Sequence, residues 1–413
     1  MAAEPSDRVD VAIVGGGPAG LAAATELRSL GIQSVVVLER DRDIGGIPRH
    51  CGHYPFGMHE FNRVLRGPDY AARLAARARQ AGVDVRTGAS AIAIFPGPRL
   101  TLSTAEGLGE LTARKILLAT GVRERSRAAR MIGGTKPGGV VSTGALQGLV
   151  YLDRIRPFLR PVILGTELVA FSALFTCRHL GIKPLAMIEP GARVTAMRAA
   201  SLFPRLTGTA LLLETEVTAI RGDRKVEEVV LRDSSGATRT LATDGVIVSG
   251  QFLPEASLIT DSHVEVDPKS GGPKVDQFGR CSDPDVFAAG NLLRAVETAG
   301  WSWAEGRAVA RNIARNLRGE LPEGANVINV GVEGPLKYVV PQRITDRPRE
   351  GGVAGSFQLR VTRPIRGTLR LAVDGREVWS SRIHSLPERR ITLPVSILPA
   401  GAGTSAIFSV AEG

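Results

Sequence analysis

The sequence predicts an α/β protein with two doubly wound, three-layer units of parallel strands and helices, followed by a small all-β sandwich. The first unit is indicated by a short β-branched run near the N-terminus, which leads into a glycine-rich turn and a helix pattern. A similar strand–turn–helix–strand spacing returns in the middle of the chain and predicts a second unit of the same kind. The sandwich is indicated by alternating apolar and polar residues in the last part of the chain.

The first unit is organised around the sequence VDVAIVGGGPAG at residues 9–20. Its β-branched residues are typical of a buried parallel strand, and an Ala- and Leu-rich helix pattern occupies residues 18–30. Between the two, Gly15, Gly17 and Gly20 fit the pattern G-x-G-x-x-G. Such glycines permit a tight turn, a close approach of backbone to a pyrophosphate, and close helix–strand packing.

The next strand, expected at Ser34–Leu38, ends in Glu39. This acid lies close to the distance of about 20 residues from the first glycine that is usual for a carboxylate that binds ribose hydroxyls. Strand, glycines, helix, strand and acid together predict a dinucleotide site. The alternative is a glycine-rich turn without a ligand.

The rest of the first unit reads as a loop at Gly45–Gly46, a helix at Phe61–Gln80 and a series of short strands. The strands are expected at Val83–Thr87, Ala91–Phe95, Leu100–Ser103, Gly109–Ala113 and Arg114–Gly121.

The second unit is expected to begin with a strand at Pro161–Leu164, and its next strand ends in Glu189. The turn between them does not follow the glycine pattern, because Glu167 stands where the second glycine would let backbone approach a pyrophosphate. A carboxylate there adds bulk and a negative charge against another anion. We therefore predict that NAD(P) binding is lost or weakened; the alternative is a shifted loop that tolerates the substitution.

Further strands are expected in both the second unit and the C-terminal part. Three at Leu211–Glu214, Glu216–Arg221 and Lys225–Arg232 would form a β-meander, Asp244–Ser249 would return to the first unit, and Pro273–Phe278 would be a short strand. The sandwich strands are expected at Phe357–Val361, Gly367–Val373, Val378–His384, Arg390–Leu393 and Ser405–Val410.

These elements predict four parts of the chain. The predicted boundaries are 1–125 with 245–320 for a discontinuous first domain, 126–244 for the second, 321–354 for a linker arm rich in Pro, Gly and Arg, and 355–413 for the sandwich.

The 413-residue chain is basic, with 52 Lys and Arg against 41 Asp and Glu, a net charge of +11. These charges are dispersed, without runs of like charge or interleaved aromatic residues, which argues against nucleic-acid binding. Part of the excess lies after Val330. There it would suit either docking of an acidic partner protein or a plain solvated surface.

The three cysteines, Cys51, Cys177 and Cys281, are widely spaced, which predicts neither a disulfide framework nor a C-x-x-C metal or redox pair. The N-terminus is short, polar and acidic, and no run of about 18 apolar residues occurs. We therefore expect neither a signal peptide nor a transmembrane segment. The expected location is the cytoplasm, from which a partner could bring the chain to a membrane surface.

Four motifs together resemble the FAD-dependent pyridine nucleotide–disulfide oxidoreductase superfamily over residues 1–320. They are the first glycine motif, Glu39, an A-T-G turn at 119–121 and a V-F-A-A-G motif at 286–290. More narrowly, GGIPRHCGHYPFGM and AAGNLLRAVETAGW are similar to the subunits of hydrogen cyanide synthase and opine oxidase that carry this core. They also resemble the corresponding partner in glycerol-3-phosphate-oxidase-type operon sets. Relatives of the opine-oxidase type can carry iron–sulfur cysteines at the C-terminus, whereas this chain has no cysteine after Cys281.

The resemblance implies bound FAD and a set of residues that contact it. For the pyrophosphate and adenine ribose these are Gly15, Gly17, Pro18, Ala19, Gly20, Glu39, Arg40 and Gly46, and for the remainder of the cofactor Ala119, Thr120, Gly121, Gly290, Asn291 and Thr298. Asn291 stands where the family usually has an Asp that receives the ribityl chain; its amide oxygen can still accept, but one negative charge is missing. A helix at Thr298–Leu317 would direct its start towards the flavin and stabilise negative charge there.

The loop that contains His50, Cys51 and His53 is the weak candidate for chemistry. Disulfide reductases of this superfamily carry a cysteine pair beside the flavin, but Cys51 has no second cysteine nearby, which argues against dithiol chemistry. Either histidine could act as a general base or an electrostatic partner of the flavin. Alternatively the loop is structural, and metal binding is a weaker third interpretation. Trp301 and Trp303 would either wall a cavity near the flavin or simply pack.

These features favour an FAD-dependent oxidoreductase subunit. It would pass electrons between its flavin and a partner dehydrogenase or oxidase subunit that acts on an amine, a hydroxy acid or a polyol. One alternative is a stand-alone NAD(P)H-dependent flavin reductase. Another is a non-catalytic scaffold that FAD only stabilises.

Overall fold

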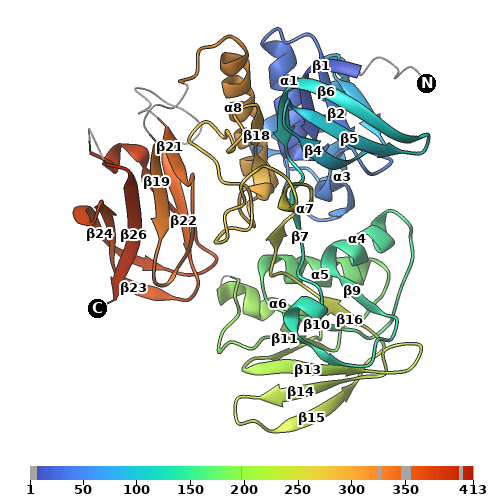
Figure 1. Cartoon of the computed structure of the whole chain (residues 1–413). Coiled ribbons are helices and arrows are strands. Elements are labelled where there is room, and N and C mark those ends of the chain that lie inside the picture. The colour runs from blue at the N-terminus through green and yellow to red at the C-terminus, as the bar shows by residue number, and fades with distance from the viewer. Residues whose placement is uncertain (1–6, 197, 323–326, 346–354, 400–402, 413) are drawn as a thin grey trace.

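The computed structural model describes residues 7–196, 198–322, 327–345, 355–399 and 403–412. It contains two α/β units and a C-terminal pair of β-sheets (Figure 1). The first unit lies at the top of that view, the second below it, and the C-terminal sheets to the left. None of the helices in the described ranges is long and apolar enough to cross a membrane.

The first unit is a doubly wound sheet in which β3, β2, β1, β6 and β18 run parallel, with β5 and β4 added antiparallel beyond β6. Its elements are β1 (Asp7–Val14), α1 (Pro18–Ser29), β2 (Val35–Glu39), α3 (Gly67–Gln80), β3 (Asp84–Thr87), β4 (Ser90–Phe95), β5 (Arg99–Thr104), β6 (Gly107–Leu118), α7 (Ser257–Thr260), β18 (Val286–Ala288) and α8 (Ala299–Leu317). Every residue of β2 is buried, as expected for a central strand covered on both faces.

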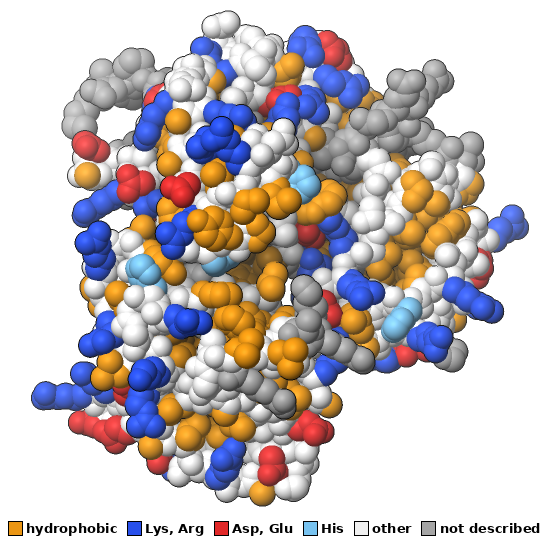
Figure 2. Space-filling model, turned by 180° about the vertical axis from the view of Figure 1, so that it is seen from behind, with side chains coloured by type: hydrophobic (Ala, Val, Ile, Leu, Met, Phe, Trp, Pro, Cys, Tyr) orange, Lys and Arg blue, Asp and Glu red, His pale blue; other side chains and the backbone are white. Residues whose placement is uncertain are grey.

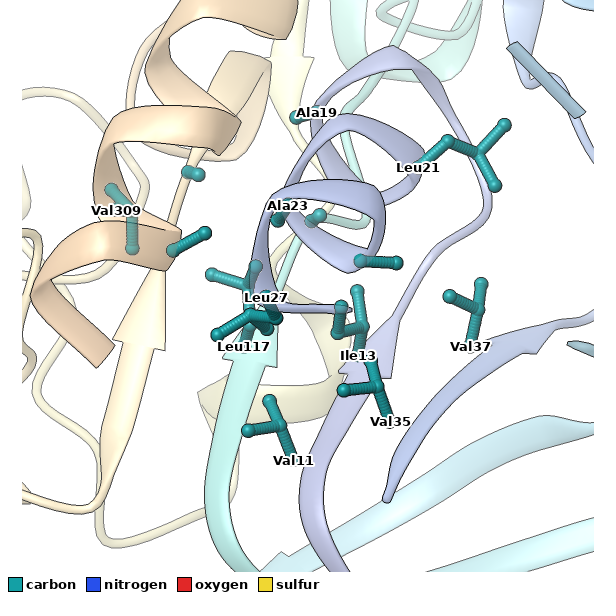
Figure 3. Packing of buried hydrophobic residues seen from close by; sticks show 14 of the residues in the cluster. Val11, Ile13, Ala19, Leu21, Ala23, Leu27, Val35, Val37, Leu117 and Val309 are labelled. Carbon is teal, nitrogen blue, oxygen red and sulfur yellow. The ribbon is translucent and has the colours of Figure 1, made fainter. Parts of the chain in front are cut away.

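The helical face of this sheet is packed by α1, α3 and α8. Figure 3 shows Ile13 and Val35 of the strands against Leu27 of α1, with Val309 of α8 beside them. The opposite face is covered by the β4–β5 hairpin and α7, and also by Tyr338 from the C-terminal sheets. The small residues of α1 let the helix lie close to the sheet and to α8.

The second unit repeats this architecture as a parallel sheet of order β12-β11-β10-β16-β9, next to an antiparallel sheet of β15, β14 and β13 with β8 at its edge. Its elements are β8 (Gly133–Gly134), β9 (Val140–Ser142), α4 (Thr143–Tyr151), β10 (Val162–Leu164), α5 (Leu168–His179), β11 (Ala186–Ile188), α6 (Leu202–Leu206), β12 (Ala210–Leu212), β13 (Thr215–Arg221), β14 (Glu228–Asp233), β15 (Thr238–Ala242) and β16 (Val246–Val248). The expected strand at Leu211–Glu214 was wrongly assigned to the meander, because β12 pairs with β11.

Two short connecting segments, which we call the ribbons, join the two units. The chain leaves the first unit through β7 (Val122–Arg123) and returns through β17 (Leu253–Pro254), and these short strands pair antiparallel.

Several sequence predictions about the first unit are corrected by the structure. The helix expected at Phe61–Gln80 begins only at Gly67, because Asn62 adopts φ +50° and ends the short helix α2 (Met58–Phe61). The two strands expected at 109–121 form one strand, β6. Residues 273–278 are not a strand of the sheet; Val275 instead pairs with the C-terminal sheets, since its carbonyl accepts from the Gln342 N–H at 3.1 Å.

The C-terminal part consists of two sheets around a shared apolar core, with orders β21-β19-β26-β23-β24 and β20-β22-β25. Its strands are β19 (Val327–Val332), β20 (Leu336–Val340), β21 (Arg343–Thr345), β22 (Ser356–Val361), β23 (Ile365–Val373), β24 (Arg376–Ser385), β25 (Ile391–Pro394) and β26 (Ser405–Glu412). We refer to these strands as the C-terminal sheets. The prediction of a linker arm at 321–354 was wrong for the described residues of that range. Strands β19, β20 and β21 lie there and complete both sheets. Residues 323–326 and 346–354 of that arm lie outside the described structure.

Figure 2 shows that Lys and Arg side chains are scattered over the face opposite to that of Figure 1, among acidic and neutral side chains. This view agrees with the dispersed charge that the sequence indicates.

The packing of α1 on α8 depends on Gly306. A Cβ at this position would lie 2.1 Å from the Ala19 carbonyl oxygen, so Gly306→Ala forces the two helices apart. We expect the free energy of unfolding to fall by about 1–3 kcal/mol, as for other overpacked sites, measured by urea denaturation.

Gly148→Ala in α4 is the matched control, since a Cβ there meets nothing within 4 Å. This variant gains helix propensity and is expected to be up to about 1 kcal/mol more stable. Equal stability of the two variants would contradict the close approach of α1 and α8.

Candidate functional site

Two glycines of the turn between β1 and α1, Gly15 and Gly20, leave no room for a side chain. Gly15 adopts φ +111°, and a Cβ on it would lie 2.4 Å from the Ala119 carbonyl oxygen. A Cβ on Gly20 would lie 2.0 Å from the carbonyl oxygen of Gly15. The structure thus gives these two glycines the tight-turn and close-packing roles that the sequence predicts.

The start of α1 has backbone donors but no side chain that caps them. The N-cap is Gly17, and the first helical bond is donated by Leu21 to the Gly17 carbonyl at 2.9 Å. The N–H groups before Leu21 therefore have no acceptor within the helix, and the positive end of the helix dipole adds to them. A Cβ on Gly17 would meet only the Gly46 α-carbon, at 3.9 Å. This arrangement suits an anion close to the backbone.

Glu39 lies at the carboxyl end of β2 and is buried beside the turn. Its two carboxylate oxygens accept from the N–H groups of Gly16 and Asp41, each at 3.0 Å. A carboxylate offers about four lone pairs, so acceptor capacity remains for hydroxyl groups of a ligand. Arg40, the next residue, is exposed.

The loop after β2 closes over the glycine turn. Gly46 adopts φ +62°, and a Cβ there would lie 2.8 Å from the Gly17 α-carbon. The Gly45 N–H donates to the Gly16 carbonyl at 2.7 Å, which fixes the two loops together.

The turn at 119–121 links the glycine turn to the inter-unit ribbons. Ala119 lies against Gly15, while the Thr120 hydroxyl donates to the Glu255 carbonyl at 2.7 Å. The Glu255 N–H in turn donates to the Gly121 carbonyl at 2.9 Å. The Thr120 side chain thus contacts the returning ribbon.

The second predicted signature, at 287–291, is brought next to the start of α1. Gly290 has φ +76°, and a Cβ there would lie 2.9 Å from the Ala19 Cβ. The Asn291 amide oxygen accepts from the Glu297 N–H at 2.6 Å, and its amide group donates to the Glu297 carbonyl at 3.1 Å. Asn291 thus closes its own loop. Thr298 is the N-cap of α8 and accepts from the Trp301 N–H at 3.5 Å.

Ser302 is a site residue that the sequence analysis missed. Its hydroxyl is buried in the first turn of α8, has no hydrogen-bond partner among the described residues, and lies 3.8 Å from where a Gly290 Cβ would be. An unpartnered buried hydroxyl next to this turn keeps its donor capacity for a polar ligand group. Its position four residues after Thr298, on the same face of the helix, was the available sequence signal.

The loop with His50, Cys51 and His53 packs on the second unit. The Cys51 thiol contacts the Gln147 side-chain oxygen at 3.5 Å, and burial raises the pKa of this thiol to about 12. Burial also lowers the pKa of His50, whose Nδ1 has no partner within the described part of the chain. The His53 ring contacts the Tyr54 carbonyl at 3.2 Å near the surface. No cluster of metal-ligating residues occurs in the described ranges.

The two tryptophans of α8 contact arginines. Trp303 packs on the core of the first unit with Arg307 over its ring at 4.8 Å. Trp301 is half exposed and lies under the guanidinium of Arg390, at 3.9 Å from its ring centroid.

The side chain of Glu167 lies where a fold of this kind would have its ligand crevice, at the carboxyl ends of β10 and β16. The Gln251 N–H donates to its carboxylate at 2.9 Å, and a Cβ on Gly250 would lie 2.5 Å from its Cδ. Burial raises the pKa of Glu167, while the nearby positive charges of Arg130 and Lys337 oppose that rise. In open α/β sheets this crevice is where ligands bind.

Glu189, which follows β11, is also hydrogen-bonded within the protein. One of its oxygens accepts from the hydroxyls of Thr166 and Thr195, and the other accepts from the Gly191 N–H at 3.0 Å. The Thr166 hydroxyl in turn accepts from the Thr195 N–H at 2.9 Å. The counterpart of Glu39 in the second unit is therefore enclosed by side chains.

Glu124 and Arg130 bond the backbone around Gly250, next to Glu167. The Glu124 carboxylate accepts from the N–H groups of Gly144, at 2.8 Å, and Gly250, at 3.0 Å. The Arg130 guanidinium donates to the carbonyls of Ser249, at 2.7 Å, and Gly250, at 2.8 Å. Four charged side chains thus surround the second turn: Glu124, Arg130, Glu167 and Glu189. The sequence spacing pointed only to Glu167 and Glu189.

The profile of the family described as pyridine nucleotide-disulphide oxidoreductase matches residues 9–306, most of the chain. An alkyl hydroperoxide reductase subunit of Pseudomonas aeruginosa is 27% identical over 293 residues, 69% of this chain and 54% of that protein. The glutamate synthase [NADPH] small chain of Mycobacterium tuberculosis is 28% identical over 348 residues, 75% of this chain and 67% of that protein. An opine oxidase subunit of Rhizobium meliloti is 29% identical over 198 residues, 46% of this chain and 41% of that protein. The match thus spans about half the length of the first of these relatives.

Solved structures share the fold of the two α/β units. Thioredoxin reductase of T. acidophilum superposes with a TM-score of 0.63 at 22% identity and covers 75% of this chain and 99% of its own. The NAD-dependent persulfide reductase of A. fulgidus superposes with a TM-score of 0.58 at 19% identity and covers 94% of this chain and 71% of its own.

The environment of the cysteines predicts slow thiol chemistry. All three thiols are buried, and burial raises the pKa of Cys51 and of Cys177 to about 12 and raises that of Cys281 as well. Fewer than about one thiol in a thousand is then ionised at pH 8. We expect none of the three to react with Ellman's reagent within minutes in the native protein, and all to react in guanidinium chloride. Rapid modification of one thiol in the native protein would contradict this environment.

Proposed function

The chain belongs to the pyridine nucleotide-disulphide oxidoreductase family, and from this premise we propose that it is an FAD-dependent subunit of a larger oxidoreductase. FAD would exchange two electrons as a hydride or stepwise, a chemistry that protein side chains lack. The single observation that carries the proposal is the contrast between its two nucleotide turns. The first is open to an anion, and the second is filled by the protein's own carboxylates.

The residues around α1 fit FAD. The uncapped start of α1 and the glycines at 15, 17 and 20 would hold the pyrophosphate, with Glu39 free to accept from ribose hydroxyls. The unpartnered hydroxyl of Ser302 would supply a further donor. Asn291 would contribute through the shape of its loop, since its side chain is already bonded to Glu297.

A dithiol route through this chain is disfavoured by the same structure. Disulfide exchange needs an attacking thiolate and a resolving thiol within reach. Burial of Cys51 holds its pKa at about 12, and its thiol contacts Gln147. We therefore assign the loop at 50–53 a structural role, in which it holds the first unit against α4.

NAD(P)H is a poor candidate for the physiological electron donor. A pyrophosphate at the second turn would meet the Glu167 carboxylate, and a ribose would find Glu189 already bonded to Thr166 and Thr195. Displacement of Glu189 would leave the buried hydroxyl of Thr166 unpaired. Electrons would then come from, or go to, another subunit.

The names of two relatives support a multi-subunit assembly. One is named as a subunit of opine oxidase, and the other is named as the small chain of glutamate synthase. By this analogy the partner subunit would oxidise an amine, a hydroxy acid or a polyol.

Anaerobic mixing with reduced nicotinamides tests the choice of electron donor. We expect NADH and NADPH to leave the yellow oxidised flavin spectrum unchanged over minutes, whereas dithionite bleaches it. Bleaching by either nicotinamide within seconds would instead support a stand-alone NAD(P)H-dependent flavin reductase. A flavin that no substrate reduces, even in the complex with co-purified subunits, would support a scaffold without catalytic function.

Glu167→Gly tests how far a single side chain closes the second site. We expect at most a severalfold gain in NADH affinity, because Glu124, Arg130 and the enclosed Glu189 remain in place. Isothermal titration of the variant and of the wild type gives the comparison. A gain of about a hundredfold or more, near 2.7 kcal/mol, would mean that Glu167 alone obstructs the site.

Glu39→Ala tests the assigned ribose contact. We expect a lower FAD content after purification and a lower unfolding temperature, because bound ligand stabilises the folded state by mass action. Glu110→Ala, an exposed acid on β6, is the control and should keep full flavin content. Unchanged flavin content in Glu39→Ala would contradict the contact.

A further inference from the structure

We propose that the C-terminal sheets form part of the FAD site, because Gln358, Arg360 and Arg390 hold the loop Gly290–Glu297 in its binding conformation. The inference rests on the FAD binding proposed above and adds positioning residues from a part of the chain outside the match of the family profile, which ends at residue 306. We call the residues involved the interface ion network: Arg294, Glu297, Glu305, Gln358, Arg360 and Arg390.

The loop has a defined shape that its own side chains close. Asn291 at its start bonds both the N–H and the carbonyl of Glu297 at its end, at 2.6 and 3.1 Å. The Gly290 N–H donates to the Glu305 carboxylate at 2.8 Å. The position of the loop relative to α1 therefore depends on where Glu297 and Glu305 are held.

Glu297 is held by the C-terminal sheets. Its carboxylate accepts from the Arg360 guanidinium at 3.2 Å and forms an ion pair with the Arg390 guanidinium, also at 3.2 Å. Arg360 of β22 also donates to the Val296 carbonyl at 2.8 Å. The Arg390 side chain lies over the ring of Trp301 as well, at the start of α8. Two arginines from the C-terminal sheets thus fix the end of the loop.

Glu305 is held through Arg294, which lies within the loop. The Arg294 guanidinium bonds the two Glu305 oxygens at 2.9 and 3.3 Å, and its Nε donates to the Gln358 side-chain oxygen at 2.9 Å. The Arg294 side chain is only 2% exposed. Gln358 of β22 also accepts from Arg390 at 3.3 Å, so both ends of the loop share one partner strand.

Burial makes these contacts mutually dependent. A buried charge is stable only when it is paired, and removal of one partner leaves the other uncompensated. The network joins three positive and two negative side chains. Glu297 is paired with Arg360 and Arg390, both at 3.2 Å, and more distantly with Arg294 at 4.0 Å, so the loss of Arg360 or Arg390 removes one of its two close partners. We expect the loop then to adopt other conformations as well. The affinity for FAD falls in proportion to the fraction of molecules whose loop has left the native conformation.

A purely structural role would have a different signature. If the network only attached the C-terminal sheets, its loss would lower the stability of the FAD-free protein without a specific effect on FAD. If it positions the loop, the rate of FAD release rises and the flavin environment changes while the FAD-free protein remains folded. FAD release and the visible circular dichroism of the bound flavin separate these cases.

The test compares Arg360→Ala, Arg360→Lys and a control in the wild-type background of the full chain. Arg360→Ala is expected to raise the FAD dissociation rate at least about tenfold, equivalent to about 1.4 kcal/mol, and to alter the visible circular dichroism. Arg360→Lys keeps a charge opposite Glu297 and should recover part of the loss. Arg370→Ala removes a surface pair with Glu377 in the same sheets and should leave both readouts at the wild-type value.

Each outcome bears on one proposal. Wild-type FAD release in Arg360→Ala, or equally fast release in Arg370→Ala, would overturn the positioning role while leaving FAD binding intact. A wild-type chain that cannot be loaded with FAD would instead overturn the proposed function. If Arg360→Ala does not fold, Arg390→Gln takes its place, because it keeps a hydrogen-bonding group opposite Glu297. Faster FAD release is again the expected result, and release at the wild-type rate would again overturn the positioning role.

Discussion

The backbone N–H groups at the start of α1, which have no acceptor within that helix, are the feature on which the rest of the molecule depends. These donors exist because Gly17 caps the helix without a side chain and because Gly15 and Gly20 bring strand and helix together. The dipole of α1 adds to their preference for negative charge. Around them lie Glu39 and Ser302, whose polar atoms retain capacity for a ligand. A dinucleotide diphosphate would satisfy these groups together, which is why the family relationship and the geometry lead to the same proposed cofactor.

The second α/β unit has a similar parallel sheet, but a carboxylate of the protein lies at its turn, where the first unit has uncapped backbone N–H groups. The carboxyl ends of β10 and β16 form the crevice in which such folds bind ligands, yet the carboxylate of Glu167 lies in it and bonds the Gln251 N–H. Arg130 and Glu124 bond the same stretch of backbone around Gly250. Charged groups that would otherwise receive a nucleotide are satisfied within the chain. On the function proposed above, this unit would hold the loop at 50–53, through the contact between Cys51 and Gln147, rather than a second dinucleotide.

The C-terminal sheets connect to the first unit by both apolar and ionic contacts. Tyr338 packs on the sheet face opposite α1. The Val275 carbonyl accepts from the Gln342 N–H, and the Val275 N–H donates to the Gln342 side-chain oxygen. Arg360 and Arg390 reach the loop that carries Asn291. The positive charge that the sequence shows after Val330 is thus in part directed inward, where it pairs with Glu297, and only in part solvated.

The sequence by itself determined the features that depend on local spacing. The β-branched runs, the glycines at 15, 17 and 20, and the acid at Glu39 specify strand, turn and helix through short-range sterics, and the structure places them together. Spacing also predicted that Glu167 lies at the second turn, and the structure places its carboxylate beside Gly250 and Gln251. Only the tertiary structure decided what depends on contacts between distant segments. The helix expected from Phe61 starts at Gly67 because Asn62 turns the chain, and the expected linker arm supplies strands because β19 finds β26 as its partner. The interface ion network was equally invisible, since an arginine acquires its role from neighbours that lie far away in sequence. For Ser302 the helix position was readable, but the lack of a partner for its buried hydroxyl was not.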